Sequence, residues 1–150
     1  MDDTDKKILK LLQADGRLTN QQLSDHINIS PAACWRRVKS LENAGIITGY
    51  VARLEPEAAG VGLTAFLQIS LQRHSRDAAH RFEARVEEVD EVLECHSVAG
   101  TTDYLLKVAA KNIREYENLL NDIVFDLPGV DQVHSLISLR PVKESMAYPL

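Results

Sequence analysis

Apolar residues recur at helical spacing in three short stretches of the first 45 positions, which predicts three helices. The first follows a cap at Asp3 or Thr4 and ends at the turn residues 15–16. Thr19 and Gln22 form a capping-box pattern that opens the second helix. The apolar residues expected to be buried by these two helices are Ile8, Leu9, Leu11, Leu12, Leu23 and Ile27.

The third helix follows the second after a connection of only residues 28–30. Ser30 is expected to cap it, and Pro31 fits its first turn, where a missing N–H is harmless. Its apolar face holds Cys34, Val38 and Leu41, and its opposite, basic face holds Ala32, Arg36, Lys39 and Asn43. Two helices so closely joined form either a plain helical hairpin or a helix-turn-helix, and the preceding helix favours the DNA-binding interpretation.

Gly45 is placed for a left-handed helix cap, and the alternating residues 46–60 after it predict an extended linker strand. Because an isolated strand needs a partner, this linker should pack as a wing on the helices or pair with a second chain. We therefore expect a helix-turn-helix domain at residues 1–45 and a second domain at residues 61–150.

The second half of the chain follows the order β-α-β-β-α-β. Strands are predicted at 63–71, 92–99, 104–110 and 133–139, one helix begins at Ser75 or Asp77, and another runs from the cap at Asn112 to Pro128. These helices should bury Phe82, Val86, Val89, Ile113, Tyr116, Leu120, Ile123 and Leu127. The order predicts a ferredoxin-like domain, which makes the chain an α+β protein.

A ferredoxin-like domain carries its helices on one face of the sheet, so the other face is left bare. The candidates for this bare face are Phe66, Val98 and Leu136. An exposed apolar face predicts that chains associate through their sheets.

The net charge of −5 is unevenly distributed, which keeps nucleic acid among the expected partners. Residues 1–50 hold seven Lys+Arg and six Asp+Glu, a sum of +1, whereas residues 51–150 hold ten and sixteen, a sum of −6. Three of the seven basic residues of the first half, Arg36, Arg37 and Lys39, are concentrated on the third helix. No apolar run reaches the length of a membrane span, so we expect a cytoplasmic protein with no membrane partner.

Nothing in the sequence makes a strong case for catalysis or a metal. Cys34 and Cys95 lack CxxC spacing and read as small apolar residues, and residues 87–91 are an acidic run typical of a solvated helix end. His96 and His134 could meet across adjacent strands as a metal or proton site, although histidines on a sheet are more often ordinary surface residues. We expect no catalytic residue, no metal ligand and no cofactor.

Two segments carry a resemblance to a known family: LExxGxIxGY from Leu41 and GxxDYLLKV from Gly100. With DxxDKKIL from Asp2, DGRLT from Asp15 and LPGVDQVHS from Leu127, they make the chain similar along its whole length to Lrp/AsnC (leucine-responsive, or feast/famine) transcription regulators. The resemblance implies a homodimer, often assembled into octamers, that binds a double-stranded DNA operator and responds to an amino acid.

The resemblance also implies which residues meet DNA. The reading helix would run from Ser30 to Asn43, with Ala32, Trp35, Arg36 and Lys39 nearest the groove and Arg37 and Ser40 nearer phosphates. The helix geometry supports Arg36 best, because it lies opposite the apolar face. Arg37 has a second interpretation as a clamp to an acid, and the Trp35 ring has one as a packing group on the linker or first helix.

In similar proteins the amino acid lies between regulatory domains of neighbouring subunits. Carried over, that site comprises Val98, Gly100, Thr101, Thr102, Asp103 and Tyr104, with Leu136, Ile137 and Ser138 opposite. A turn of this kind offers backbone N–H groups to a carboxylate and Asp103 to an ammonium. Gly100 and Asp103 would also occur in a hairpin turn with no ligand.

The leading function is therefore a sequence-specific regulator that responds to an amino acid. One alternative is an architectural, nucleoid-type protein that wraps DNA and takes no effector. The other is an enzyme, since the sirohaem decarboxylases resemble the same two-domain plan; the basic face of the third helix speaks against it.

Replacement of Asp103 by alanine should abolish the response to the amino acid and leave basal DNA binding intact, because the acceptor for the ammonium is lost. Calorimetry with a mixture of the standard amino acids, combined with gel-shift titration, would measure both properties. A variant with an unchanged response would refute this role.

Overall fold

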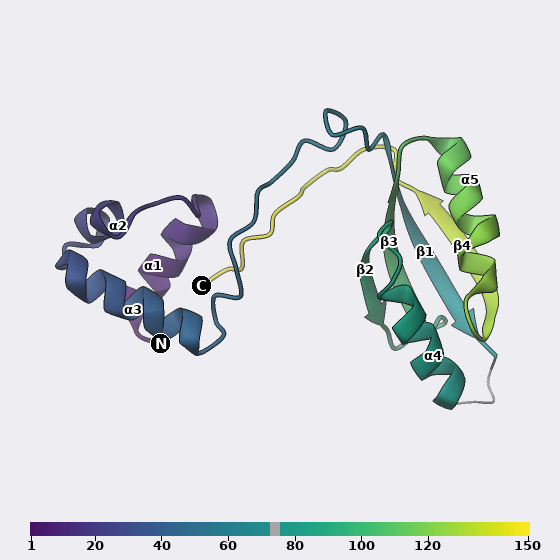
Figure 1. The fold of residues 1–150 in the computed structure, drawn as a ribbon, viewed down its shortest axis with the longest axis horizontal. Coiled ribbons are helices and arrows are strands. Elements are labelled where there is room, and N and C mark those ends of the chain that lie inside the picture. Colours follow the sequence, from purple (N-terminus) through teal and green to yellow (C-terminus); the bar gives the residue numbers. More distant parts are fainter. Residues whose placement is uncertain (73–75) are drawn as a thin grey trace. The chain divides into compact units, whose positions relative to one another are not determined.

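The computed structural model describes residues 1–72 and 76–150, so the expected helix start at Ser75 lies outside the described residues. The chain forms two compact units (Figure 1): residues 1–53 with 142–150, and residues 54–141. Within the described part, no helix has the length and apolar character needed to cross a membrane.

The first unit contains α1 (Asp3–Ala14), α2 (Asn20–Ile27) and α3 (Pro31–Asn43). Its core holds the apolar residues expected from the sequence: Ile8, Leu9, Leu23, Cys34 and Leu41 are buried, and Leu11, Leu12, Ile27 and Val38 pack against them. Burial raises the pKa of the Cys34 thiol. The three-helix prediction is confirmed.

The N-terminal cap of α1 is not the expected residue, whereas the glycine after α3 is. Asp2, not Asp3 or Thr4, caps α1: its carboxylate accepts the Asp5 N–H at 2.9 Å, and Asp5 accepts the Asp2 N–H at 3.0 Å. A carboxylate at that position satisfies free backbone donors, so the helix starts earlier than the apolar pattern alone indicates. Gly45 ends α3 with a φ of 68°, as expected.

Arg37 ties α3 to the beginning of α1. Its Nη1 lies 2.9 Å from Asp2 Oδ2 and 2.7 Å from Asp5 Oδ1. The Asp5 N–H and then the Arg37 guanidinium hold the pKa of Asp2 below its usual range, and the two carboxylates raise the pKa of Arg37. Of the two interpretations of Arg37, the structure shows the clamp.

Residues 46–60 contain no strand, so the predicted linker strand is absent from the single chain. The physical reason is that no other segment within residues 1–72 and 76–150 forms a ladder with them, and strand pairing with a second chain stays a prediction. The start of the linker does pack on the helices: Ile47 joins their core, and the Tyr50 hydroxyl donates to Glu42 at 3.2 Å.

The C-terminal segment, residues 142–150, packs with the helices rather than with residues 61–141. The side-chain carboxamide of Gln13 in α1 makes two hydrogen bonds with the backbone of Tyr148. Its Nε2 donates to the Tyr148 carbonyl at 3.2 Å, and its Oε1 accepts the Tyr148 N–H at 2.6 Å. A segment without side-chain periodicity thus docks through its backbone.

The second unit is a four-stranded antiparallel sheet with its helices on one face (Figure 1). The strands β1 (Leu63–Leu71), β2 (Val92–Ser97), β3 (Tyr104–Ala110) and β4 (Val130–Ile137) lie in the order β2-β3-β1-β4, and the helices are α4 (Arg76–Val86), α5 (Ile113–Asp122) and the 3₁₀ turn η1 (Val124–Asp126). This is the expected ferredoxin-like arrangement.

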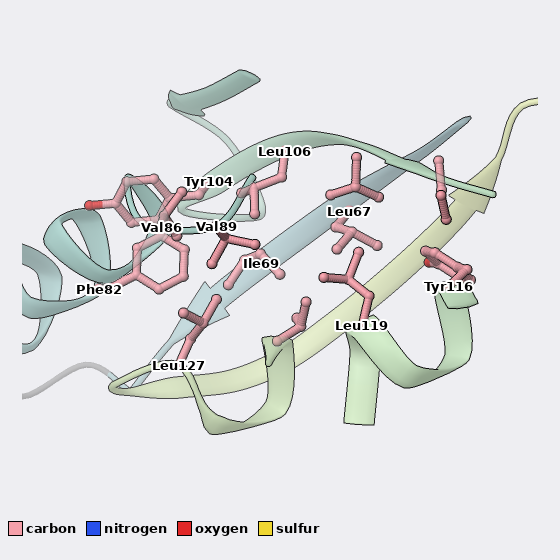
Figure 2. Packing of buried hydrophobic residues seen from close by; sticks show 14 residues of the cluster. Leu67, Ile69, Phe82, Val86, Val89, Tyr104, Leu106, Tyr116, Leu119 and Leu127 are labelled. Atoms are coloured by element: carbon pink, nitrogen blue, oxygen red, sulfur yellow. The ribbon is translucent and has the colours of Figure 1, made fainter. Parts of the chain in front are cut away.

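The core between sheet and helices follows the period-two pattern of the strands (Figure 2). Ala65, Leu67 and Ile69 of β1 are fully buried against residues of α4, α5 and η1. Ile113, expected to be buried, is 59% exposed; it is the first residue of α5, and the buried stripe starts one turn later at Tyr116.

The other face of the sheet is open, as predicted. Phe66 of β1 stands opposite Leu136 of β4, and both are exposed. His96 lies on β2 and His134 on β4, at opposite edges of the sheet, so the alternative in which the two histidines meet across adjacent strands does not hold within one chain. Two intervening strands keep them about 14 Å apart.

Substitution of Arg37 by alanine should lower the midpoint of thermal unfolding at neutral pH, because two carboxylates of α1 lose their partner. Arg36→Ala is the matched control, since Arg36 contacts no carboxylate among the described residues. The difference between Arg37→Ala and the parent should shrink on acidification, because the lowered pKa of Asp2 gives a contribution lost as pH falls. Equal midpoints for the two variants at neutral pH would contradict the clamp.

Two buried tyrosines should respond differently to removal of their hydroxyl. Tyr104 donates to Glu83 at 2.7 Å, so Tyr104→Phe should lower the free energy of unfolding by about 1 kcal/mol. The buried Tyr116 hydroxyl has no partner among the described residues, so Tyr116→Phe should leave stability unchanged or raise it by about 1 kcal/mol. Urea unfolding would measure both, and equal losses would contradict the assignment.

Candidate nucleic-acid interface and effector site

The exposed face of α3 is the first candidate site. Cys34 and Leu41 anchor the opposite side of the helix in the core, which turns Ala32, Trp35, Arg36, Lys39 and Ser40 outward; all five are exposed. Trp35 is 55% exposed, so a large part of this residue is open to solvent. Ser30 caps the helix by accepting the Ala33 N–H at 3.2 Å.

The three basic side chains of α3 differ in whether an acidic side chain lies beside them. Arg37 is held by Asp2 and Asp5, and Lys39 lies 3.1 Å from Glu42, one turn along the helix. Arg36 has no acidic partner within the described part of the chain. Its guanidinium therefore keeps all its donors available for a ligand.

A cavity of about 420 Å³ lies beside this face, between α1 and α3. Its lining consists of Asp5, Ala33, Arg36, Arg37, Ser40 and Leu41. The outward residues together offer what a major-groove reader needs: a fork of N–H donors suited to guanine, a small side chain at Ala32 that permits close approach, and an aromatic ring beside them.

The second candidate site is a cavity of about 440 Å³ on the open face of the sheet. It is lined by Gln68, Ser70, Thr101, Thr102, Gln132, His134, Ser135 and Leu136. Of the nine residues expected at an effector site, it brings together Thr101, Thr102 and Leu136.

Tyr104 and Ile137 lie on the other face of the sheet, so the structure separates them from this cavity. Tyr104 is buried, its ring centroid is 4.6 Å from that of Phe82, and burial together with the bond to Glu83 raises the pKa of its hydroxyl to about 12. Ile137 pairs with the buried Ala65 and shares its face. The cause is the strand period of two, which turns neighbouring residues to opposite faces.

The other expected residues contribute their backbone or shape the loop. Asp103 Oδ2 accepts the Leu71 N–H at 2.7 Å, and the Asp103 carbonyl accepts the Val98 N–H at 2.9 Å. The Ser138 N–H donates to Thr64 at 2.9 Å. A side chain at Gly100 would meet no atom within 4 Å, so the space above this turn is open. Asp103 thus holds the turn through its Oδ2, and its Oδ1 has no hydrogen-bond partner among the described residues.

Five residues of the cavity were not expected from the sequence: Gln68, Ser70, Gln132, His134 and Ser135. The sequence does show that Gln68 and Ser70 of β1 alternate with buried residues, which places them on the open face. Their opposition to His134 and Gln132 depends on the pairing of strands far apart in sequence, and no local pattern encodes that register.

Comparison with known proteins matches each unit of the chain to a described family. Residues 1–48 match the winged helix-turn-helix DNA-binding family. Residues 64–148 match the Lrp/AsnC ligand binding domain. Together these matches cover both of the candidate sites.

Individual relatives match nearly the whole chain. The leucine-responsive regulatory protein of Salmonella typhimurium is 39% identical over 97% of this chain and 88% of its own. A Neisseria meningitidis transcriptional regulator, crystallised as a complex with L-Met, is 39% identical with a TM-score of 0.95, covering 99% of this chain and 96% of its own. An AsnC family regulator of Agrobacterium tumefaciens is 32% identical with a TM-score of 0.94, covering 99% and 97%. The chain thus belongs to the Lrp/AsnC family of transcription regulators, with a DNA-binding helix-turn-helix unit and an amino-acid-binding domain.

Proposed function

We propose that α3 is inserted into the major groove of a DNA operator and that Arg36 reads a base there. The observation that carries this proposal is the contrast between neighbouring arginines: Arg37 is consumed by an internal clamp, whereas Arg36 points outward without an acidic partner in the described chain. Ala32, Trp35 and Lys39 would contact the groove beside it, and Ser30 and Ser40 the phosphates. The role proposed for Arg37 is to hold α3 in its orientation through the ion pairs with Asp2 and Asp5, and not to contact DNA directly.

An amino acid bound at the open-face cavity is the proposed signal. In this proposal the turn at 100–102 would offer backbone N–H groups to its carboxylate, and the Asp103 carboxylate, whose Oδ2 accepts the Leu71 N–H, would accept from its ammonium through Oδ1. Thr101, Thr102 and Leu136 are the expected effector-site residues that line this cavity. The Neisseria relative was crystallised with L-Met, which supports an amino acid as the class of effector.

Assembly of chains is the proposed link between the two sites. The exposed pair of Phe66 and Leu136 offers an apolar surface to a second copy, and the dimer so formed would assemble further to octamers. A ligand shifts such an equilibrium only by binding one assembly better than another, with a coupling of about 1–3 kcal/mol. We place this activity in the cytoplasm, where the DNA is.

The substitution Arg36→Ala should weaken operator binding by about 1–3 kcal/mol and relax the preference at one base position, because the guanidinium can grip guanine at two atoms. Arg114→Ala is the matched control, since it removes the same charge from α5 in the other unit. Fluorescence anisotropy on an operator and its point variants would measure both effects. Equal loss on every sequence would reassign Arg36 to a phosphate.

The function as a whole is tested by selecting bound fragments from random DNA, with and without a mixture of the standard amino acids. Convergence on an inverted repeat that shifts or tightens with the mixture is the expected result. Retention without convergence would favour an architectural DNA-wrapping protein. Failure to retain DNA under either condition would refute the regulator.

A further inference from the structure

The turn directly after α3 brings the start of the linker back beside the helix. Gly45 has a φ of 68°, and the Ile46 and Ile47 N–H groups both donate to the Leu41 carbonyl, at 3.0 and 3.2 Å. A left-handed residue followed by such hydrogen bonds ends a helix and satisfies its last carbonyl groups. Ile47 then packs on the core of the helical unit, so the first residues of the linker have a fixed place.

Tyr50 of the linker is held both at its ring and at its hydroxyl. A Cβ at Gly16 would lie 3.4 Å from Tyr50 Cδ1, so the ring lies close over the turn between α1 and α2. The hydroxyl donates to Glu42 Oε1 at 3.2 Å. Burial and then the Glu42 carboxylate raise the pKa of Tyr50, so the hydroxyl is protonated at neutral pH and remains a donor.

Glu42 uses its two carboxylate oxygens for two different partners. Its Oε1 accepts the Tyr50 hydroxyl, and its Oε2 lies 3.1 Å from Lys39 Nζ, one turn back along α3. The Glu42 side chain is 29% exposed and that of Lys39 is 54% exposed, so the lysine is the more open of the two to a ligand. The three side chains thus form a line of contacts from the linker to the outward face of α3.

A lysine held in this way is better prepared to bind DNA than a free one. A free lysine side chain loses much of its rotamer freedom when a ligand immobilises it, and ordering the side chain beforehand reduces that loss. The Lys39 ammonium has three donors and Glu42 accepts from one of them, so two remain for DNA. The arrangement also has a cost, because the Glu42 carboxylate repels the phosphates of any DNA bound at this face.

We propose that Glu42 is a positioning residue for DNA recognition: it orients Lys39 toward one base position of the operator, and Tyr50 makes this orientation depend on the linker. The inference rests on the proposed function, in which Lys39 contacts the groove beside Arg36. It accounts for three of the positions that define the segment LExxGxIxGY, namely Glu42, Gly45 and Tyr50. The start of the linker is then part of the DNA-reading surface.

The first experiment compares Glu42→Gln with the parent by fluorescence anisotropy at fixed salt, on the selected operator, its point variants and random DNA. Affinity for random DNA should rise, because a repelling charge is removed. Discrimination at one base position should fall about threefold, because Lys39 is no longer oriented. Glu117→Gln, which removes the same charge from an exposed position of α5, is the matched control and should change neither property. Unchanged discrimination at every base position, or an equal loss of affinity on all DNA, would overturn the positioning role.

The second experiment assigns the effect to Lys39 by a double-mutant cycle. Lys39→Ala should abolish discrimination at that base position, and adding Glu42→Gln should cause no further loss there. An equal effect of Glu42→Gln with and without Lys39 would contradict the proposal. Full discrimination by Lys39→Ala at every base position would refute the groove contact of Lys39 and the positioning role with it. Absence of any preferred site for the parent would refute the proposed function on which the inference rests.

The third experiment tests the part played by the linker. Tyr50→Phe keeps the ring over Gly16 and removes only the hydroxyl that donates to Glu42. The variant should lose discrimination at the same base position as Glu42→Gln, but its affinity for random DNA should stay at the parent's level because the Glu42 charge remains. Thermal unfolding would establish that the variant is folded. Discrimination equal to the parent's in folded Tyr50→Phe would overturn the link between Tyr50 and Lys39.

Discussion

The side-chain period of β1 is the constraint on which the second unit depends. Its odd-numbered residues Ala65, Leu67 and Ile69 are fully buried under the helices, so its even-numbered residues must face the other way. One strand therefore supplies the centre of the core and the floor of the cavity. A register slip of a single residue would exchange the two, which means that the burial of three small and medium side chains also fixes where Gln68 stands.

In the first unit, the same logic operates with the period of a helix. Arg36 and Arg37 are neighbours in sequence but are separated by about 100° around α3. This angle brings Arg37 to the carboxylates of α1 and leaves Arg36 facing solvent. An arginine paired with carboxylates inside the unit and an arginine exposed to solvent are thus adjacent in sequence, because the helical turn angle points them in different directions.

Much of this organisation could be predicted from the sequence because it is local. Helix faces, the capping pair of Thr19 and Gln22, and the left-handed glycine at position 45 all follow from spacing within a few residues. The face of the sheet on which Tyr104 lies was also predictable, because Tyr104 is two residues from the buried Leu106 and a strand turns such residues to the same face. The family resemblance points to whole segments and does not distinguish the two faces. The ion pairs of Arg37 and the opposition of Gln68 to His134 join residues far apart in the chain, where no periodicity specifies the partner.

The docking of Tyr148 on Gln13 gives the chain an interlaced connectivity. Polypeptide passes from the helical unit to the sheet unit once after residue 53 and returns once after residue 141. The returning segment continues from β4, the strand that lines the cavity with His134 and Leu136. The segment hydrogen-bonded to α1 is therefore covalently continuous with β4. After a single cut in residues 54–60, the two fragments would share no covalent bond and would be linked through the contacts of residues 142–150 with the helical unit.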